Sequence, residues 1–422
     1  MKHVKGKLAQ DIHVIEAVVR RFGPLSRSKI HELTHIRRSA TSEIVRELLK
    51  EGRLLEAGRV NGNSPLGRKQ VLLCLNEEHR FVAGVEFDDE AVVAGVLDLH
   101  PRVKQTITEP PRLGDGKEGL VKQLLSCTRR ALEKAGLRAR SLLGIGIADP
   151  GLVDSRRGVT VTSSTIDFWT QVPLQAIFEK EFGVPTIVES KTRARTAAER
   201  ILGAGEMRES MIYVDYGAGI GAGIILDGKF LHGQNCAAGE FGHTHLMENG
   251  PPCKCGSFGC LEAIAGARAV EDKIRRAIAG GGASRALALA GGDPEKITVW
   301  NVLEAARLGD KTCSHIVAEV ASFLGLGLAN LVNLFNPSVI VLDRRLELAG
   351  QSLLEQIVQI VKRQALTYSA EHAVFRFGRL EREAGVLGVA LLVLEKHFEI
   401  PLLKPPRFMI DPEAVGSALR GS

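Results

Sequence analysis

The sequence EFGHTHLMENGPPCKCGSFGCLE, residues 240–262, gathers one histidine and three cysteines in a single loop. His243 is followed by Cys253, Cys255 and Cys260, at spacings of ten, two and five residues. Three thiolates and one imidazole form a complete tetrahedral set for zinc, which leaves no position for an activated water. We therefore predict a structural Zn²⁺ that fixes the loop. The alternative, a group of reduced thiols without metal, is disfavoured because three of the seven cysteines lie so close together among glycine and proline.

Three motifs occur in order around this loop. They are GAGIGAGIILDGKF from Gly217, GEFGH from Gly239 and CKCGSFGCLE from Cys253. Together they resemble the signature of the ROK family of repressors and sugar kinases. The resemblance implies that the histidine and the three cysteines hold a structural zinc. It also implies that Glu240, His243 and Glu262 face the hydroxyls of a bound hexose.

The length of 422 residues predicts two or three domains, and 45% apolar with 25% charged residues is typical of a soluble globular protein. No uninterrupted apolar segment approaches eighteen residues, and the N-terminal sequence MKHVKGKLAQ lacks the apolar core of a signal peptide. We therefore expect a cytoplasmic protein without a membrane partner. The four other cysteines are scattered singly, which does not indicate a disulfide framework.

Positive charge is concentrated at one end of the chain. Residues 1–80 contain sixteen Lys and Arg against nine Asp and Glu, and the remainder contains 39 against 40. A basic balance confined to one small domain is expected of nucleic-acid binding. A basic, solvated face without a partner is the alternative.

The same 80 residues show the pattern of three helices followed by a hairpin. Apolar residues recur at helical spacing over residues 11–22, Ser26 can cap a second helix, and Arg38-Ser39 open a third that ends at Gly52. The short turn around His35-Ile36 is typical of a helix-turn-helix. Leu54-Leu55 and Val71–Leu75 then predict a hairpin whose long tip starts at Gly58, which forms a wing. The segment resembles the winged helix of ROK repressors, and a three-helix protein-interaction module is the alternative.

The residues expected to contact double-stranded DNA lie on the helices and the wing. In the third helix Arg38 is expected nearest to a base edge, and the wing residues are suited to phosphate or minor-groove contacts. The whole set is Arg27, Arg37, Arg38, Ser39, Thr41, Ser42, Arg46, Arg59, Arg68 and Lys69.

From Phe81 onward strands and helices alternate, which indicates an α/β protein. This part resembles the actin-like, ribonuclease H-like two-lobed sugar-kinase fold. We expect a winged helix-turn-helix domain at 1–80, a first lobe at 81–198 completed by a helix within 385–400, and a second lobe with the zinc loop at 199–384. A C-terminal tail follows at 401–422.

Two kinase motifs of the family are altered in this chain. The phosphate-binding Asp-x-Gly-Gly-Thr turn is replaced by Glu86-Phe87-Asp88-Asp89-Glu90, whose acids would repel a triphosphate. The Gly-Gly pair near the adenosine is matched by Asp343-Arg344, which adds bulk there. We therefore expect no binding of ATP.

The catalytic Asn-Asp pair of the kinases is matched by Ser190 and Lys191. A protonated lysine cannot remove a proton from a sugar hydroxyl, so no catalytic residue is expected. Lys191 either favours an anionic sugar derivative or forms a salt bridge, for which Glu189 and Glu240 are the candidate partners.

These features predict a DNA-binding transcriptional regulator of the ROK type, a repressor with a catalytically dead sensor domain. The sensor is expected to bind a sugar or sugar derivative through Glu240, His243, Glu262, Ser190 and Lys191. We expect a homodimer or homotetramer, because winged-helix repressors read paired half-sites of an operator. One alternative is a regulator that has lost sugar binding and responds to a protein partner. Another is an active sugar kinase.

Overall fold

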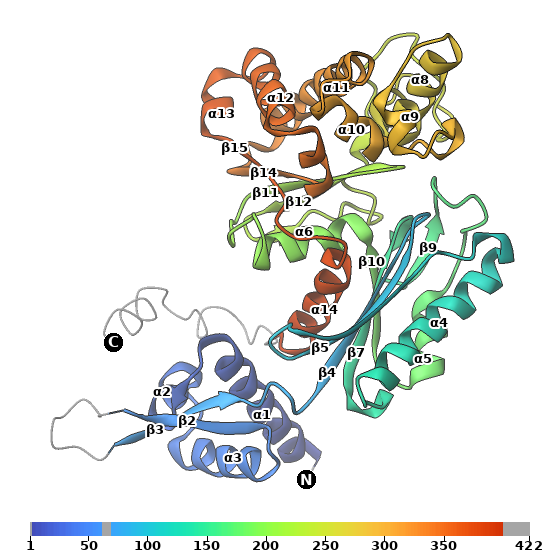
Figure 1. Cartoon of the computed structure of the whole chain (residues 1–422). Coiled ribbons are helices and arrows are strands. Elements are labelled where there is room, and N and C mark those ends of the chain that lie inside the picture. The colour runs from blue at the N-terminus through green and yellow to red at the C-terminus, as the bar shows by residue number, and fades with distance from the viewer. Residues whose placement is uncertain (1, 61–68, 400–422) are drawn as a thin grey trace. The chain divides into compact units, whose positions relative to one another are not determined.

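The computed structural model describes residues 2–60 and 69–399 (Figure 1). Contacts divide these residues into two compact units. The first contains the chain up to Phe81, Asp98–Arg102 and the segment from Leu394, and the second contains Val82–Leu97 and Val103–Val393. The wing residue Arg68 and the tail at 401–422 lie outside the described residues.

The first unit combines three helices with a small antiparallel sheet. The helices are α1 (Lys2–Phe22), α2 (Arg27–Thr34) and α3 (Arg38–Lys50), and the strands β1 (Leu25–Ser26), β2 (Leu54–Val60) and β3 (Gln70–Leu75) have the order β1-β3-β2. The Ser26 hydroxyl accepts from the Lys29 amide at 3.2 Å and caps α2, as predicted. His35, with a left-handed φ of 55°, ends α2 before α3 begins. This is the winged helix-turn-helix fold.

Two boundaries of this unit differ from the prediction. α1 begins at Lys2 rather than Asp11, because residues 2–10 lack an apolar period although most of them are good helix formers. β2 continues to Val60 through a bulge at Gly58, whose φ is 129°. The first residues of the predicted loop, from Gly58 to Val60, therefore belong to strand β2.

The second unit has two lobes, each built on a five-stranded sheet. The strand orders are β10-β7-β4-β5-β6 and β13-β12-β11-β14-β15. The first lobe contains β4 (Phe81–Phe87), β5 (Val92–Asp98), β6 (Val103–Glu109), β7 (Leu142–Asp149) and β10 (Thr186–Ser190), with a separate ribbon of β8 (Leu152–Asp154) and β9 (Val159–Thr162). The second lobe contains β11 (Met211–Tyr216), β12 (Ile220–Leu226), β13 (Lys229–Phe230), β14 (Val339–Leu342) and β15 (Val374–Phe377). This is the predicted two-lobed sugar-kinase fold.

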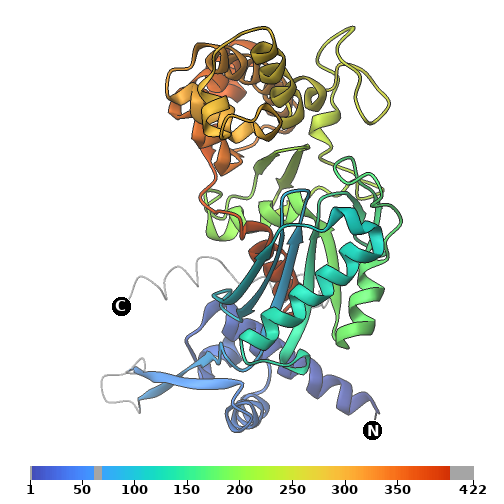
Figure 2. The ribbon, with the colours of Figure 1, turned by 45° about the vertical axis from the view of Figure 1, so that its right-hand side comes forward.

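Helices cover both faces of each sheet (Figures 1 and 2). On the first sheet α4 (Gly116–Lys134) and α5 (Leu174–Phe182) lie on one face and α14 (Ala384–His397) on the other. On the second sheet α6 (Lys191–Leu202) packs against β11 and β12. The remaining helices of the second lobe are α7 (Leu261–Ala265), α8 (Ala267–Ala279), α9 (Arg285–Leu289), α10 (Val299–Arg307), α11 (Lys311–Phe335), α12 (Gln351–Gln364) and α13 (Thr367–His372). Short 3₁₀ helices are η1 (Leu113–Asp115), η2 (Ala139–Ser141), η3 (Phe241–His243), η4 (Pro294–Lys296) and η5 (Arg344–Ala349).

Glycines allow α14 to lie against both the first sheet and α6. A Cβ atom at Gly146 of β7 would lie 2.6 Å from the Val389 carbonyl oxygen. On α14 itself, a Cβ atom at Gly388 would lie 1.7 Å from the Ala194 carbonyl oxygen of α6. Larger side chains at either position would separate these elements. The predicted return of the last helix to the first lobe is therefore present.

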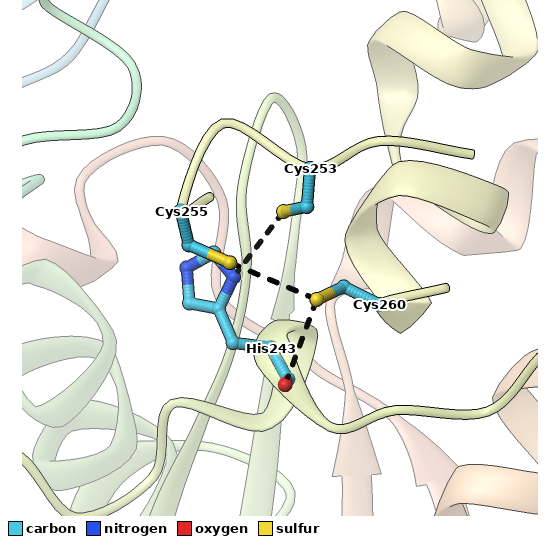
Figure 3. A group of neighbouring side chains, drawn as sticks. All are labelled: His243, Cys253, Cys255 and Cys260. Carbon is cyan, nitrogen blue, oxygen red and sulfur yellow. Dashed lines mark hydrogen bonds between the residues drawn. The ribbon is translucent and has the colours of Figure 1, made fainter. Parts of the chain in front are cut away.

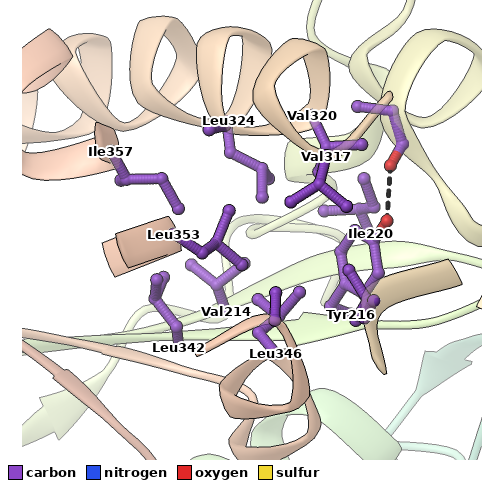
Figure 4. Close-up of a cluster of buried hydrophobic side chains, with 14 of the residues drawn as sticks. Val214, Tyr216, Ile220, Val317, Val320, Leu324, Leu342, Leu346, Leu353 and Ile357 are labelled. Atoms are coloured by element: carbon purple, nitrogen blue, oxygen red, sulfur yellow. Dashed lines mark hydrogen bonds between the residues drawn. The ribbon is translucent and has the colours of Figure 1, made fainter. Parts of the chain in front are cut away.

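The main core of the second lobe lies between its sheet and the long helix α11 (Figure 4). Val214, Val317, Leu324 and Leu353 are among its buried side chains. α11 extends over 25 residues from Lys311 to Phe335. It is long and apolar enough to span a bilayer, but 61% of its most apolar window is buried inside the protein. Its apolar character is therefore accounted for by the core.

Candidate functional site

One histidine and three cysteines come together in the second lobe (Figure 3). The ligand atoms of His243, Cys253, Cys255 and Cys260 all lie within 4.8 Å of one another. The Nδ1 atom of His243 is 3.6 Å from the Cys253 sulfur, and the sulfurs of Cys255 and Cys260 are 3.7 Å apart. The four predicted ligands therefore form a set that can hold one metal ion.

Short backbone hydrogen bonds shape the loop that carries these cysteines. The Cys253 amide donates to the Ser257 carbonyl at 2.8 Å. Gly259 has a φ of 65°, and a Cβ atom there would lie 1.9 Å from the Met247 carbonyl oxygen. Glycine at position 259 is thus required to return Cys260 toward the other three ligands.

A cavity of about 500 Å³ lies beside this cluster. Small-molecule sites usually occupy about 300–1,000 Å³, so the volume suits a ligand of sugar size. All five residues predicted to contact the effector line the cavity: Ser190, Lys191, Glu240, His243 and Glu262. Residues 88–90 of the altered phosphate turn line it as well.

The two glutamates of the cavity have different surroundings. An oxygen of Glu262 accepts from the Ile220 amide at 3.0 Å, and a Cβ atom at Gly219 would lie 3.2 Å from that same oxygen. The retained glycine loop therefore gives Glu262 room and a donor. Glu240 lines the cavity. Desolvation raises the pKa of its carboxyl, and the nearby His243 acts in the opposite direction. A carboxylate so placed can accept hydrogen bonds from hydroxyl groups.

Lys191 forms a salt bridge, but not with the predicted partners. Its Nζ atom lies 3.4 Å from Asp88 and 3.5 Å from Asp215. Burial alone would lower the pKa of Lys191, but these two carboxylates raise it. The predicted pairing with Glu189 or Glu240 is wrong. Residue spacing within the strand suggested Glu189, whereas the fold brings Asp88 and Asp215 to the start of α6 from two other strands.

The partner of Glu189 is the next arginine on α6. The Arg193 guanidinium lies 2.6 Å from a Glu189 oxygen, and the Ser155 hydroxyl donates to the same oxygen at 2.8 Å. Burial opposes ionisation, but His232, Arg193 and Ser155 together lower the pKa of Glu189 to about 2. Glu189 is therefore an anion that is already bound within the protein.

The turn after β4 is closed by its own carboxylate. An oxygen of Asp88 accepts from the Glu90 and Ala91 amides, both at 2.9 Å. Burial opposes ionisation, but Lys191 and Arg195 lower the pKa of Asp88 to about 2. An anionic side chain thus uses the amide groups that a glycine turn would offer to a phosphate.

A buried arginine that the sequence analysis did not single out connects these carboxylates. Arg195 on α6 lies 2.7 Å from Glu86, 3.1 Å from Asp215 and 3.3 Å from Asp343. Its side chain is only 7% exposed, so its charge must be matched inside the protein. The sequence KTRAR on a helix between two sheets was the signal that could have indicated such a network.

Most of the predicted DNA-contacting residues are accessible in the first unit. Arg37, Arg38, Ser39, Arg46, Arg59 and Lys69 are exposed, and Arg27 and Ser42 are half-buried. Thr41 is an exception, because it is 1% exposed and its hydroxyl donates to the Arg37 carbonyl at 3.1 Å. The prediction that Thr41 faces the groove is therefore wrong. It holds the start of α3 instead.

Arg38 and Lys69 are expected to affect DNA binding in different ways. Arg38→Ala should flatten sequence preference, with a loss of about 1–3 kcal/mol in discrimination, because a guanidinium at the start of a recognition helix can bind guanine bidentately. Lys69→Ala should weaken all sequences alike and reduce the salt slope. Anisotropy titrations over a salt series, with duplexes selected by the full-length protein, measure both. Equal effects of the two variants on all sequences would contradict the assignment of Arg38.

The chain matches the ROK family over residues 90–396. It is 30% identical over 380 residues to a xylose repressor of Caldicellulosiruptor bescii, which covers 89% of this chain and 93% of the repressor. The crystal structure of a ROK family transcriptional regulator, a homologue of the E. coli MLC protein, is 24% identical with a TM-score of 0.79, and covers 94% of this chain and 98% of that one. A ROK family glucokinase from Streptomyces griseus, solved with glucose and AMPPNP, is 30% identical with a TM-score of 0.65, and covers 74% of this chain and 98% of that one.

The protein therefore belongs to the ROK family. The xylose repressor matches 89% of the chain, whereas the glucokinase matches 74% of it. Within the family, this coverage makes the chain a repressor of the ROK type.

Proposed function

We propose that this ROK-type repressor binds an operator through its winged helix and senses a sugar or sugar derivative in the cavity of its second unit, without phosphoryl transfer. One observation carries the proposal. Glu240, His243 and Glu262 line a cavity of sugar size, while both groups that phosphoryl transfer would need are replaced by residues bound to one another. Asp88 accepts hydrogen bonds from the backbone amides of the altered phosphate turn. Lys191 replaces the catalytic base and pairs with Asp88.

Zinc is the metal that we assign to the His243 cluster. Zinc–sulfur bonds of about 2.3 Å in a tetrahedron separate two sulfurs by about 3.8 Å. The separations of 3.7 Å between Cys255 and Cys260 and of 3.6 Å between Cys253 and His243 fit two edges of such a tetrahedron. One imidazole and three thiols suit zinc better than hard cations, which prefer oxygen. The ion would hold the segment between Glu240 and Glu262 in place.

The proposed repressor acts in the cytoplasm as a homodimer or homotetramer. A repressor must reach DNA, and paired winged helices match paired half-sites of an operator. A sensor that has lost sugar binding is the second candidate, supported by the replacement of the Asn-Asp pair by Ser190 and Lys191. The Lys191 ammonium no longer supports an anionic effector, because two carboxylates already match its charge.

We expect no ATP-dependent phosphorylation of glucose, N-acetylglucosamine or N-acetylmannosamine. The physical reason is that a lysine cannot take the hydroxyl proton and that three acids repel the triphosphate. A coupled assay of ADP formation measures this, with the Lys191→Ala protein as the matched background. Turnover by the native protein that disappears in this variant would contradict the proposal.

A further inference from the structure

All three acids of the turn after β4 are paired with bases that do not belong to the first sheet. This turn, residues 88–90, is called the acidic turn below. Its pairs are Asp88 with Lys191 at 3.4 Å, Asp89 with Arg268 at 3.7 Å, and Glu90 with Arg345 at 3.4 Å and with Arg382 at 3.6 Å. Repulsion of phosphate alone does not explain why each acid of this turn has a basic partner.

Glu90 reaches a built platform in the second lobe. The indole nitrogen of Trp300 donates to Glu90 at 3.3 Å. The Arg345 guanidinium lies 4.2 Å from the centre of the Trp300 ring, and it also donates to the Tyr216 carbonyl at 2.8 Å. Trp300 and Arg345 therefore hold each other in place and present two donors to one carboxylate.

Three of the partners are carried by elements of the second lobe. Arg268 lies on α8, Trp300 on α10 and Arg345 in η5, and all three elements contribute to the core of that lobe. The acidic turn follows β4, a strand of the first sheet. The contacts of Asp89 with Arg268, and of Glu90 with Trp300 and Arg345, thus connect the two lobes at the wall of the cavity, which residues 88–90 and Arg345 line.

The ion pairs that connect the two lobes can separate. The side chains of Glu90 and Arg382 are 38% and 47% exposed, and those of Asp89 and Arg268 are 28% and 41% exposed. Ion pairs with this exposure are individually weak and are screened by salt. Several of them together can favour a closed cavity without locking it.

We propose that the acidic turn is a clasp that closes the two lobes over a single ligand, where the phosphates of a nucleotide would otherwise connect them. The site then needs no nucleotide beside the sugar, and it takes an uncharged sugar rather than a phosphorylated one. Among the residues lining the cavity, seven Asp and Glu face four Lys and Arg, which disfavours a phosphate. The assignment of an uncharged sugar as the ligand rests on the proposed sugar-sensing function. The role of the acidic turn in closing the two lobes does not depend on that function.

The pair of Asp89 and Arg268 allows a charge-swap experiment. Nitroxide labels on non-natural residues at the exposed positions Lys134 of α4 and Lys362 of α12 report the distance between the lobes in the full-length protein. We expect Asp89→Lys, and separately Arg268→Glu, to lengthen and broaden the distance distribution. The double variant should restore it. Glu355→Lys on α12 changes the charge of an exposed residue by the same amount as Asp89→Lys, and it should leave the distance distribution unchanged.

Glucose and glucose 6-phosphate are the calorimetric probes in the same proteins. We expect glucose to bind, its affinity to fall about tenfold in Asp89→Lys and to return in the double variant, because a smaller closed population binds more weakly. Glucose 6-phosphate should bind more weakly than glucose.

An unchanged distance distribution in both single variants would overturn the clasp. A distance response without binding of either probe would support the clasp but overturn glucose as its ligand. Tighter binding of glucose 6-phosphate would overturn the ligand class alone.

Discussion

Replacing Arg195 with methionine is expected to destabilise the second unit by about 3–5 kcal/mol, because removal of one partner leaves buried carboxylates without a matching charge. Arg195 is 7% exposed and lies within 3.3 Å of oxygens from three acids. Both tryptophans, Trp169 and Trp300, belong to the second unit, so their fluorescence during urea unfolding reports on this unit alone. The unfolding midpoint and slope give the loss in free energy.

The loss should depend on pH in a defined direction. In the native protein the pKa of Asp88 is lowered from 3.8 to about 2, and that of Asp343 is also lowered, with Arg195 among the causes in both. A carboxyl with a lowered folded pKa contributes stability above its unfolded pKa of about 3.9 and loses it as the pH falls toward the folded value. Without Arg195 its part of this lowering is lost, while Lys191 still lowers the pKa of Asp88 and Arg345 still lowers that of Asp343. The difference between variant and native protein should therefore be largest near pH 7 and shrink below about pH 4.

Arg200→Met provides the matched control for this substitution. Arg200 is on the same helix and donates to the carbonyls of Arg208 and Gly228, at 3.1 and 3.3 Å. Its loss removes hydrogen bonds but leaves no buried carboxylate unmatched, so we expect a loss of about 1 kcal/mol without strong pH dependence. Equal losses for the two variants at every pH would contradict the role given to Arg195.

Cys255→Ser is expected to remove the metal and unfold the cysteine loop. Binding of structural zinc is worth about 10–16 kcal/mol in zinc-finger peptides, so a lost ligand should cost several kcal/mol of local stability. Cys255 is exposed, and the cost therefore arises from the ligand set rather than from core packing. Metal analysis should give one zinc per chain in the native protein and much less in the variant. Cys74→Ser, in the first unit, should retain the metal.

The same variant should lose sugar binding, because Glu240 and Glu262 stand at the two ends of the segment that the proposed metal would hold. Hydrogen exchange of residues 240–262 measures the unfolding directly. If native protein contains no zinc, and Cys255→Ser keeps both the protection of this segment and the binding of sugar, the structural role of the metal is wrong.

The elements of the fold were largely predictable because their signals are local. In the sequence, Gly183 marks the end of α5 and an apolar run marks β11. The start of α1 was missed because its first residues carry no apolar period. β6 was not predicted either, because its side chains show no regular alternation of buried and exposed positions and only Ile107 is fully buried.

The grouping of the histidine and the three cysteines was predictable because these four residues follow one another in a single loop. The ionic network was not, because its members are far apart in sequence. Asp88, Lys191 and Asp215 meet only after three separate elements are placed side by side. The number of acids in residues 86–90 indicated that phosphate would be repelled, but only tertiary structure could show which bases those acids bind.

The most direct test is the affinity of the full-length protein for an operator selected from a random duplex library, measured by anisotropy with and without xylose or glucose, and with and without Mg-ATP. We predict that DNA is selected, that one of these sugars changes the affinity at least about tenfold, and that ATP has no further effect. No sugar phosphate should form in the same mixture. If no duplex is selected, or if the sugar acts only with ATP and is converted to its phosphate, the account of a sugar-sensing repressor without kinase activity is contradicted.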